Sequence, residues 1–232
     1  MKSKGSKQNA ASRTQLPVDA SKSQSSGETR ELILVTAEQL FAQHGVEAVS
    51  NRRISEAAGQ ANNSAVGYHF GTQEDLVLAI VGRHAESIEQ RRAERLAQLS
   101  TSSELRDWVA CLVRPMTEHL AAQDHPTWYA QFIAQVMTHP ALRTLVVRQT
   151  IAAQPLQQTI RGMLRLVPQL PRAVQKERSD MSRLLIVHSC AERERALHAG
   201  TATPRATWSA AANGLIDALV GLWLAPVWRR HS

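Results

Sequence analysis

The 232-residue sequence lacks the signals that mark membrane and secreted proteins. It has no run of about 18 apolar residues, the length that a membrane-spanning helix needs. Its first residues include lysines but not the apolar core of a secretory signal. The only two cysteines, Cys111 and Cys190, are too few for a disulfide framework or a structural zinc site. These absences predict a cytoplasmic protein that has no membrane partner.

Motifs of catalysis and of nucleotide binding are also missing. The sequence contains no P-loop, no dinucleotide-binding fingerprint and no G-x-S-x-G nucleophile elbow. Its C-terminal histidines lack the i, i+4 histidine partner and nearby acid of a metalloenzyme motif; they are His119, His125, His139, His188 and His198. We therefore expect no catalytic residue, no metal and no cofactor. A Ser-His-Asp triad built from distant residues stays open.

Strand-like alternation does not persist anywhere, and from Thr29 onward the apolar pattern is helical. The first core-facing stripe consists of Ile33, Ala37, Leu40 and Phe41. Gly45 is expected to end this helix. Later helices are expected at 72–99, at 141–166 with a break at Pro155, at 172–199 and at 205–225. The predicted fold is all-α, with a three-helix domain at 28–82 and a larger helical domain at 83–232.

Two short helices joined by a glycine-containing turn are predicted at 51–58 and 62–70, the pattern of a helix-turn-helix. Ser50 is a good N-cap for the first helix, and Gly59 closes it. The second helix has few core residues and carries polar ones instead, namely Asn62, Asn63, Ser64, Tyr68 and His69. Amide and hydroxyl groups can read base edges in the major groove, while Tyr and His suit phosphate oxygens. One face of this helix is therefore predicted to meet DNA.

Charge is distributed unevenly along the chain. The formal net charge is +7, with +4 in residues 1–27, −3 in 28–99 and +6 in 100–232. Because the helix-turn-helix region is not basic, its phosphate contacts must come from a few placed residues and from helix N-termini. Residues 1–27 are polar, and we expect a disordered basic tail. This tail is either a solvated leader or an arm that contacts DNA.

The stretch from Thr29 to Ile80 resembles the N-terminal domain of TetR-type transcriptional regulators. The resemblance rests on Ala37, Leu40-Phe41, Gly45, the "ISEAAG" helix, the aromatic-His-Phe ending and the "GTQEDL" opening of the next helix. It implies phosphate contacts from Tyr68 and His69. Arg52 and Arg53 match positions that touch DNA in the family, with a solvated helix face as the alternative. Gly59 to Phe70 spans twelve residues, where the family commonly has eleven.

The resemblance further implies that residues 104–167 enclose a small-molecule effector. Ligand pockets are mostly apolar and contain a few polar groups. The candidate lining residues are Trp108, Leu112, Met116, His119, Trp128, Tyr129, Phe132 and Gln135. An ordinary hydrophobic core is the alternative interpretation of the same residues.

Apolar residues cover an unusually wide face of the last helix, which predicts packing against a second chain as well as its own domain. The candidate dimer-interface residues are Met181, Leu185, His188, Trp208, Leu215, Leu219 and Leu222. TetR-type regulators usually dimerise through their last two helices, so the resemblance implies the same interface. A purely intramolecular core is the alternative.

Together these features predict a DNA-binding transcriptional regulator that forms a homodimer. Its expected partners are double-stranded DNA with a palindromic operator and a small-molecule effector, and its expected mode is repression released by that effector. The alternative is an all-α enzyme or metal-binding protein with a helix-turn-helix-like N-terminus.

Overall fold

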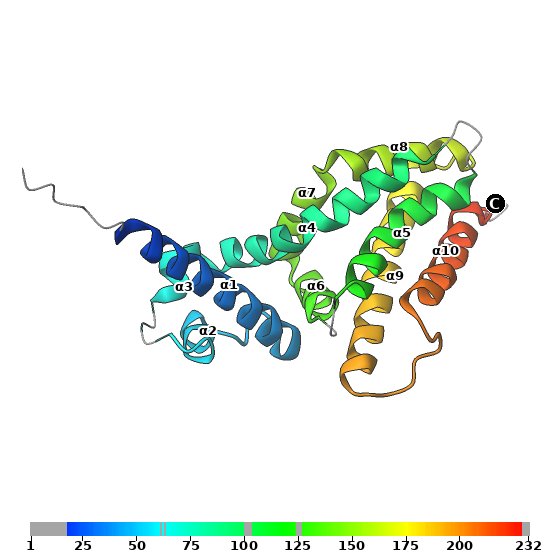
Figure 1. Ribbon diagram of the computed structural model, residues 1–232. Coiled ribbons are helices and arrows are strands. Elements are labelled where there is room, and N and C mark those ends of the chain that lie inside the picture. Colours follow the sequence, from blue (N-terminus) through cyan, green and yellow to red (C-terminus); the bar gives the residue numbers. More distant parts are fainter. Residues whose placement is uncertain (1–17, 61, 63, 100–103, 124–126, 229–232) are drawn as a thin grey trace, which may run out of the picture.

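The computed structural model describes residues 18–60, 62, 64–99, 104–123 and 127–228, and all regular elements in these ranges are helices. Three helices gather at one end of the molecule, α1 (Val18–His44), α2 (Asn51–Ala57) and α3 (Ala65–Phe70). The long helix α4 (Gln73–Ala97) leads from this end into the larger domain (Figure 1). The fold class and the two-domain organisation therefore match the prediction.

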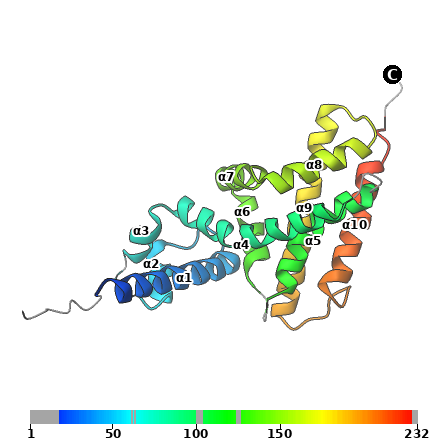
Figure 2. The same cartoon turned by 45° about the horizontal axis from the view of Figure 1, so that its top comes forward.

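Six helices build the larger domain. They are α5 (Leu105–Ala121), α6 (Tyr129–Thr138), α7 (Pro140–Ile151), α8 (Gln154–Leu166), α9 (Arg172–His198) and α10 (Trp208–Leu224). Helix α10 packs along α5, α6 packs on α9, and α5 also contacts α4 and α8. Because α6 lies against α1 as well, both α4 and α6 connect the two domains. Figure 2 shows α2 and α3 at one end and α9 and α10 at the other.

Helix α1 begins ten residues earlier than the predicted domain start at residue 28. Residues 18–27 were expected to be disordered, and the structure instead places them in the first turns of α1. Once the apolar part of a helix is held by packing, each further turn adds hydrogen bonds without a new nucleation cost. The remainder of the predicted tail, residues 1–17, lies outside the described residues.

The core of the N-terminal domain follows the predicted stripe of α1. Ile33, Ala37 and Phe41 are fully buried. Gly45 ends the helix with a positive φ of 83°, a conformation that suits glycine because it has no Cβ. The chain then turns toward α2, and Gln73 at the start of α4 donates hydrogen bonds to the carbonyl oxygens of Val46 and Val49 at 3.0 and 2.9 Å.

Helix α4 begins with a capping box that Thr72 and Asp75 form. The backbone N–H of Asp75 donates to Thr72 Oγ1 at 3.1 Å, and the backbone N–H of Thr72 donates to Asp75 Oδ2 at 3.2 Å. These two hydrogen bonds satisfy donors that the first turn of the helix leaves free. They therefore set the start of the helix that connects the two domains.

A buried arginine joins α4 to α5 at the proline of α5. Pro115 has no backbone N–H, so the carbonyl oxygen of Cys111 four residues earlier lacks its helical donor. Arg92 on α4 supplies one, because its Nη1 lies 2.5 Å from this oxygen and 3.2 Å from the carbonyl oxygen of Leu112. Arg92 is itself buried. The proline of one helix is thus matched by a donor from the next.

Two further arginines hold the C-terminal helices in place. Arg178 on α9 donates to the carbonyl oxygens of Trp223 and Ala225 at 2.9 and 2.6 Å, which satisfies acceptors at the end of α10. Arg193 donates to the carbonyl oxygens of Arg205 and Ala206 in the segment before α10. Among the described helices, none combines the length and the apolar character that a membrane crossing requires.

Candidate nucleic-acid interface

The N-terminus of α2 is capped by the predicted residue. Ser50 has an extended backbone, with φ −83° and ψ 155°, and its Oγ accepts a hydrogen bond from the backbone N–H of Arg53 at 3.2 Å. Ile54 is fully buried, whereas Arg52 and Arg53 are exposed. This end of α2 therefore points backbone donors and two cationic side chains toward solvent.

Each exposed arginine of α2 has one partner inside the chain. Arg52 Nε lies 2.7 Å from Glu56 Oε1 one turn later, and Arg53 Nη2 lies 2.8 Å from His44 Nε2 at the end of α1. Both contacts lie at the surface, where water competes with them and screens the Arg52–Glu56 charges. Both guanidinium groups therefore remain available to exchange these partners for a phosphate.

The turn between α2 and α3 is longer than the sequence pattern indicated. Gly59 has a φ of 66°, and the backbone N–H of Gln60 donates back to the carbonyl oxygen of Ser55 at 2.9 Å. Asn62 Oδ1 accepts from the backbone N–H of Ser64 at 2.9 Å, which is an Asx turn. The predicted helix start at Asn62 is corrected by this turn, because α3 begins at Ala65.

Helix α3 separates its residues by face. Ala65 and Val66 are buried, while Tyr68 is 82% exposed and His69 is half-buried. The rings of Tyr68 and His69 meet edge to face, with their centroids 5.1 Å apart. Phe70 closes the helix, and the Arg30 guanidinium lies 4.9 Å from its ring centroid. The side of α3 that carries Tyr68 thus projects from the domain instead of packing into it.

The structure brings together most of the residues predicted to contact DNA. Ser50, Arg52 and Arg53 belong to α2, and Tyr68 and His69 belong to α3, which packs on α2. Asn62 and Ser64 are exposed in the turn that precedes α3. Asn63 lies outside the described residues. The predicted set therefore falls on two neighbouring helices and the turn that joins them.

Comparison with known proteins identifies this end of the chain. Residues 33–80 match the family model described as bacterial regulatory proteins of the tetR family. Residues 33–80 therefore carry the N-terminal domain of the tetR family. The matched range begins in α1 and ends in α4, so it covers the α2–α3 pair in full.

Relatives of this chain include repressors from corynebacteria. The HTH-type transcriptional repressor AcnR of Corynebacterium glutamicum is 30% identical over 115 residues, which cover 50% of this chain and 54% of AcnR. AcnR of Corynebacterium efficiens is 34% identical over 87 residues, which cover 35% of this chain and 46% of that protein. The chain thus matches only about half the length of these curated relatives.

Solved structures of the same fold cover more of the chain. Mycobacterium smegmatis AmtR superposes with a TM-score of 0.54 at 19% identity, over 82% of this chain and 85% of AmtR. A putative TetR-family transcriptional regulator from Rhodococcus sp. gives a TM-score of 0.53 at 16% identity, over 85% and 99% of the two chains. These likenesses show that the C-terminal helices also follow the TetR fold.

The candidate effector residues do not form one group. Tyr129 and Phe132 are buried on α6, and Phe132 stacks on Phe41 of α1 with ring centroids 6.1 Å apart. Trp108 on α5 lies directly over Gly162 of α8, where a Cβ would come within 2.0 Å of the indole. Trp128 instead contacts His198 of α9 at 3.7 Å between ring centroids.

The remaining candidate effector residues also lie in different parts of the structure. Leu112 and Met116 are partly buried on α5, His119 is buried, and Gln135 approaches Gly45 at the end of α1. His119, Tyr129 and Phe132 therefore belong to the junction between the domains, where they pack as core. Trp108, Leu112 and Met116 remain on α5, in the domain for which an effector was predicted.

The predicted dimer face of α10 is corrected by the structure. Leu219 is 0% exposed and Leu215 is buried, because this side of α10 packs along α5 of the same protomer. Trp208 and Leu222 are partly buried. The predicted interface residues of α9 are more exposed than those of α10. Met181 and Leu185 are 40% and 38% exposed, and His188 is exposed. The wide apolar cover of α10 is mostly explained by its own domain.

Sequence reasoning missed two buried carboxylates. Glu38 on α1 is buried beside His84 of α4. The spacing of His84 in the sequence could have indicated that this histidine is buried, because it continues the apolar stripe of Val77, Val81 and Ile88. Glu194 on α9 accepts hydrogen bonds from Thr127 Oγ1 and from the backbone N–H groups of Ala130 and Gln131. Burial raises the pKa of Glu194 to about 7, against the lowering effect of these hydrogen bonds.

The buried ionisable groups do not assemble into a metal site. Among the described residues, no group of three or more His, Cys, Asp and Glu side chains is placed to hold a metal ion. Both cysteines are buried and unpaired, and burial raises the pKa of each thiol. A thiol held neutral in this way is a poor nucleophile and a poor metal ligand.

Proposed function

We propose that this chain is a homodimeric transcriptional repressor that binds a palindromic DNA operator and is released from it by a small-molecule effector. The observation that carries the proposal is the outer side of α3, where Tyr68 is 82% exposed beside the capped N-terminus of α2. The resemblance to repressors of corynebacteria supports repression as the mode of action.

Base edges are read from the start of the α3 segment. Asn62, Asn63 and Ser64 supply amide and hydroxyl groups, which can donate to and accept from bases in the major groove. Tyr68 and His69 hold phosphates on one side, and Ser50, Arg52 and Arg53 hold them on the other. The Asx turn at Asn62 uses one amide oxygen internally and leaves its NH₂ group as the donor.

Selection of binding sequences from a random duplex library at moderate salt tests the DNA-binding function. We expect a two-fold symmetric sequence, with half-sites about one helical turn apart because a dimer presents two copies of α3. Affinity should fall steeply with rising salt because phosphate contacts release counterions. The proposal fails if no preferred sequence emerges.

Variants of α3 separate base reading from phosphate contact. Asn63→Ala should cost about 1–3 kcal/mol on the selected sequence and relax the preference at one base position. Tyr68→Phe should weaken binding to all sequences alike. Leu166→Ala, at an exposed leucine on α8, is the control that should leave binding unchanged. An intact sequence preference in Asn63→Ala would contradict the proposed register.

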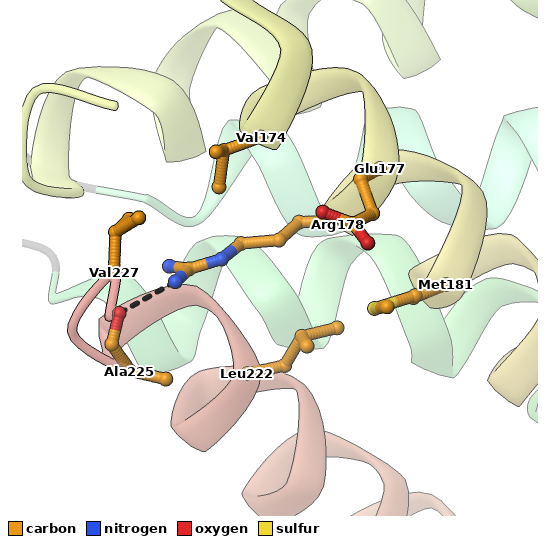
Figure 3. A pocket seen from close by; sticks show the side chains of 7 residues that line it. All are labelled: Val174, Glu177, Arg178, Met181, Leu222, Ala225 and Val227. Carbon is orange, nitrogen blue, oxygen red and sulfur yellow. Dashed lines mark hydrogen bonds between the residues drawn. The ribbon is translucent and has the colours of Figure 1, made fainter. Parts of the chain in front are cut away.

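The dimer forms through the exposed apolar side of α9 and the end of α10. Met181, Leu184 and Leu185 are 38–43% exposed on α9. A shallow groove continues this side, as Figure 3 shows, and its lining residues are Val174, Glu177, Arg178, Met181, Leu222, Ala225 and Val227. Contiguous exposed apolar surface on a folded chain marks an interaction site. A two-fold axis here would place α9 and α10 of both protomers in a four-helix arrangement.

A charge placed on α9 tests this interface. Leu185→Arg should give a folded monomer with much weaker operator binding, because each protomer then binds only one half-site. Ile151→Arg at the end of α7 is the matched control, since this isoleucine is 47% exposed and α7 packs on α4, α6 and α8. Light scattering measures the outcome, and a persistent dimer of Leu185→Arg would exclude this side of α9.

The effector binds beside α5 and acts through α4. Trp108, Leu112 and Met116 line the candidate site, and α5 contacts α4 along its length. A shift of α4 changes the separation of the two α3 helices in the dimer, so small movements destroy simultaneous binding to both half-sites. A ligand that prefers the released state by about 1–3 kcal/mol suffices for a partial switch.

A thermal-shift screen of metabolites and drugs can identify this effector. A ligand that raises the melting temperature of the wild type should have less effect on Met116→Ala, and it should weaken binding to the selected operator. A tightly bound ligand that leaves operator affinity unaltered would rule out release by an effector at this site.

A further inference from the structure

A row of buried polar side chains crosses the junction between the two domains. Glu38 on α1, His84 on α4 and His119 on α5 are each at most 5% exposed. His84 Nε2 lies 2.8 Å from Glu38 Oε2, and His84 Nδ1 lies 2.8 Å from His119 Nε2. Ser87 Oγ on α4 lies 3.2 Å from His119 Nδ1. An unbroken hydrogen-bonded row thus joins α1 of the DNA-binding domain to α5 of the effector domain.

The number of protons on the two imidazoles decides whether each contact in this row is a hydrogen bond. When both rings are neutral, Ser87 donates to His119, His119 donates to His84, and His84 donates to Glu38. When one proton is added, His84 donates at both nitrogens, and His119 changes its tautomer and donates to Ser87. Both states give each of the four imidazole nitrogens a hydrogen-bond partner.

A second added proton breaks this pattern. His84 Nδ1–H and His119 Nε2–H then face each other across 2.8 Å, and neither has an acceptor. Two imidazolium rings at this distance also repel each other in a buried site, where charges are poorly screened. The row therefore accommodates at most one added proton while it stays intact.

The positive charges of Arg83 and Arg91 near the row also oppose a second proton. Arg83 on α4 donates to Glu38 at 3.3 Å and pairs with Glu31 of α1 at 2.6 Å. Burial lowers the pKa of His119 to about 4, with further contributions from His84, Arg91 and Arg83. The cations of α4 therefore oppose a second proton on α5.

The other two neighbouring helices supply no cation to the row. Tyr129 on α6 stacks on His84 with ring centroids 3.8 Å apart, and burial raises the pKa of its hydroxyl, which stays neutral. Burial, with a smaller contribution from the Glu38 carboxylate, raises the pKa of Glu194 on α9 to about 7. Glu38 is therefore the carboxylate in direct contact with the imidazole pair.

We propose that Glu38, His84 and His119 form a proton-counting latch, which holds α1 to α5 with up to one added proton and opens when a second proton binds. Opening separates α5 from α4 and removes the polar link that positions α1. The latch itself depends only on the domain junction. Its consequence for DNA binding rests on the proposed function.

Hydrogen exchange of the full-length chain across a pH series tests the latch directly. After correction for intrinsic exchange rates, protection of peptides from α1 and α5 should fall as pH decreases from about 7 to about 4.5, by at most about tenfold per pH unit for one linked proton. Far-UV circular dichroism should stay constant in this range. Protection that does not change with pH would overturn the proposal.

A conservative variant isolates the second proton. His119→Gln keeps a side-chain N–H that can donate to His84 but cannot take up a proton, so its protection should not fall with pH. His139→Gln, at a histidine between α6 and α7 whose partner Glu47 is exposed, is the matched control and should respond like the wild type. If His119→Gln shows the same loss of protection as the wild type, the latch does not exist.

A second variant decides the question if His119→Gln fails to fold. Glu38→Gln retains an amide oxygen that accepts from His84 Nε2–H, but it lacks the charge that stabilises the first added proton. Its junction should therefore open at a pH higher than in the wild type, by about one pH unit for each 1.4 kcal/mol of lost interaction. An opening curve that coincides with that of the wild type would overturn the proposal.

The effect on DNA is measured separately, with a fluorescent duplex of the selected sequence in the same pH series. Wild-type affinity should fall in parallel with junction protection, and His119→Gln should lack this additional loss. Operator affinity that is unaffected by opening would overturn the link to DNA. A chain that binds no duplex at any pH would overturn the proposed function, while hydrogen exchange would still decide the latch.

Discussion

Two polar regions of this protein are built in opposite ways. The outer side of α2 and α3 exposes Tyr68 and Arg52, whose contacts within the chain are single and local. The row of Glu38, His84 and His119 is almost completely buried, and its members satisfy one another across three helices. One region presents polar groups outward, whereas the other uses them to join domains.

This difference separates two roles that residue type alone does not distinguish. A polar side chain that projects into water is solvated in the free chain and can exchange water for a ligand at modest cost. A buried one must keep its internal partners, because an unsatisfied buried polar group costs about 1–3 kcal/mol. Substitutions on α2–α3 should therefore affect binding, and substitutions in the junction should affect stability.

The largest contrast is expected between two aromatic residues. Phe132→Ala should destabilise the chain by about 3–5 kcal/mol, because this fully buried ring stacks on Phe41 and its loss leaves a cavity. Tyr68→Ala should change stability by no more than about 0.5 kcal/mol. Urea denaturation of both variants measures the difference. Comparable destabilisation by the two substitutions would contradict the contrast between the regions.

The pH dependence of stability should show the buried row. His119 has an ordinary pKa of 6.5 in the unfolded chain and about 4 in the folded chain, so the unfolded state binds its proton first as pH falls. The stabilisation is complete above pH 6.5 and is lost progressively down to about pH 4. The total loss is on the order of 3 kcal/mol.

Chemical denaturation at a series of pH values measures this loss. The slope of the unfolding free energy between about pH 4 and about pH 6.5 should be shallower in His119→Gln than in the wild type, because one linked proton is removed. His139→Gln should retain the wild-type slope. Equal slopes for the wild type and His119→Gln would show that His119 is not the linked group.

Two helical glycines offer a smaller contrast. Gly162→Ala should destabilise the chain by about 1–3 kcal/mol, because the new Cβ would lie 2.0 Å from the Trp108 ring. Gly82→Ala on α4 meets nothing within 4 Å and should stabilise the chain by up to about 1 kcal/mol through helix propensity. Melting temperatures report both effects. A neutral Gly162→Ala would show that the indole can move away from α8.

The smallest effect is expected within the α2–α3 pair. Ser50→Ala should cost about 1 kcal/mol of stability, because Ser50 Oγ caps α2. Ser64 occupies the corresponding position before α3 but makes no capping hydrogen bond, so Ser64→Ala should leave stability nearly unchanged. Ser64→Ala should nevertheless weaken binding to the selected duplex. An equal loss of stability in both variants would exclude a separate role for Ser64.

Local sequence signals predicted the parts of the structure that neighbouring residues control. The stripe of Ile33, Ala37 and Phe41, the Ser50 cap and the Thr72 capping box depend on spacings of three or four residues, which a helix imposes on any sequence. Helix starts were predicted less accurately where the segment has no regular spacing of apolar residues. The sequence pattern placed the start of α1 eleven residues too late, at Thr29, and the start of α3 three residues too early, at Asn62.

Sequence alone determined that the chain is helical, that it carries a helix-turn-helix, and which residues line each helix's apolar side. Only the tertiary structure decided what each side packs against. Leu219 is buried on α10, which packs on α5 of its own protomer. His84 contacts Glu38 and His119, which lie 46 and 35 residues away in the sequence. Periodicity identifies a face of a helix but not its partner, because the partner depends on how separate helices are placed in space.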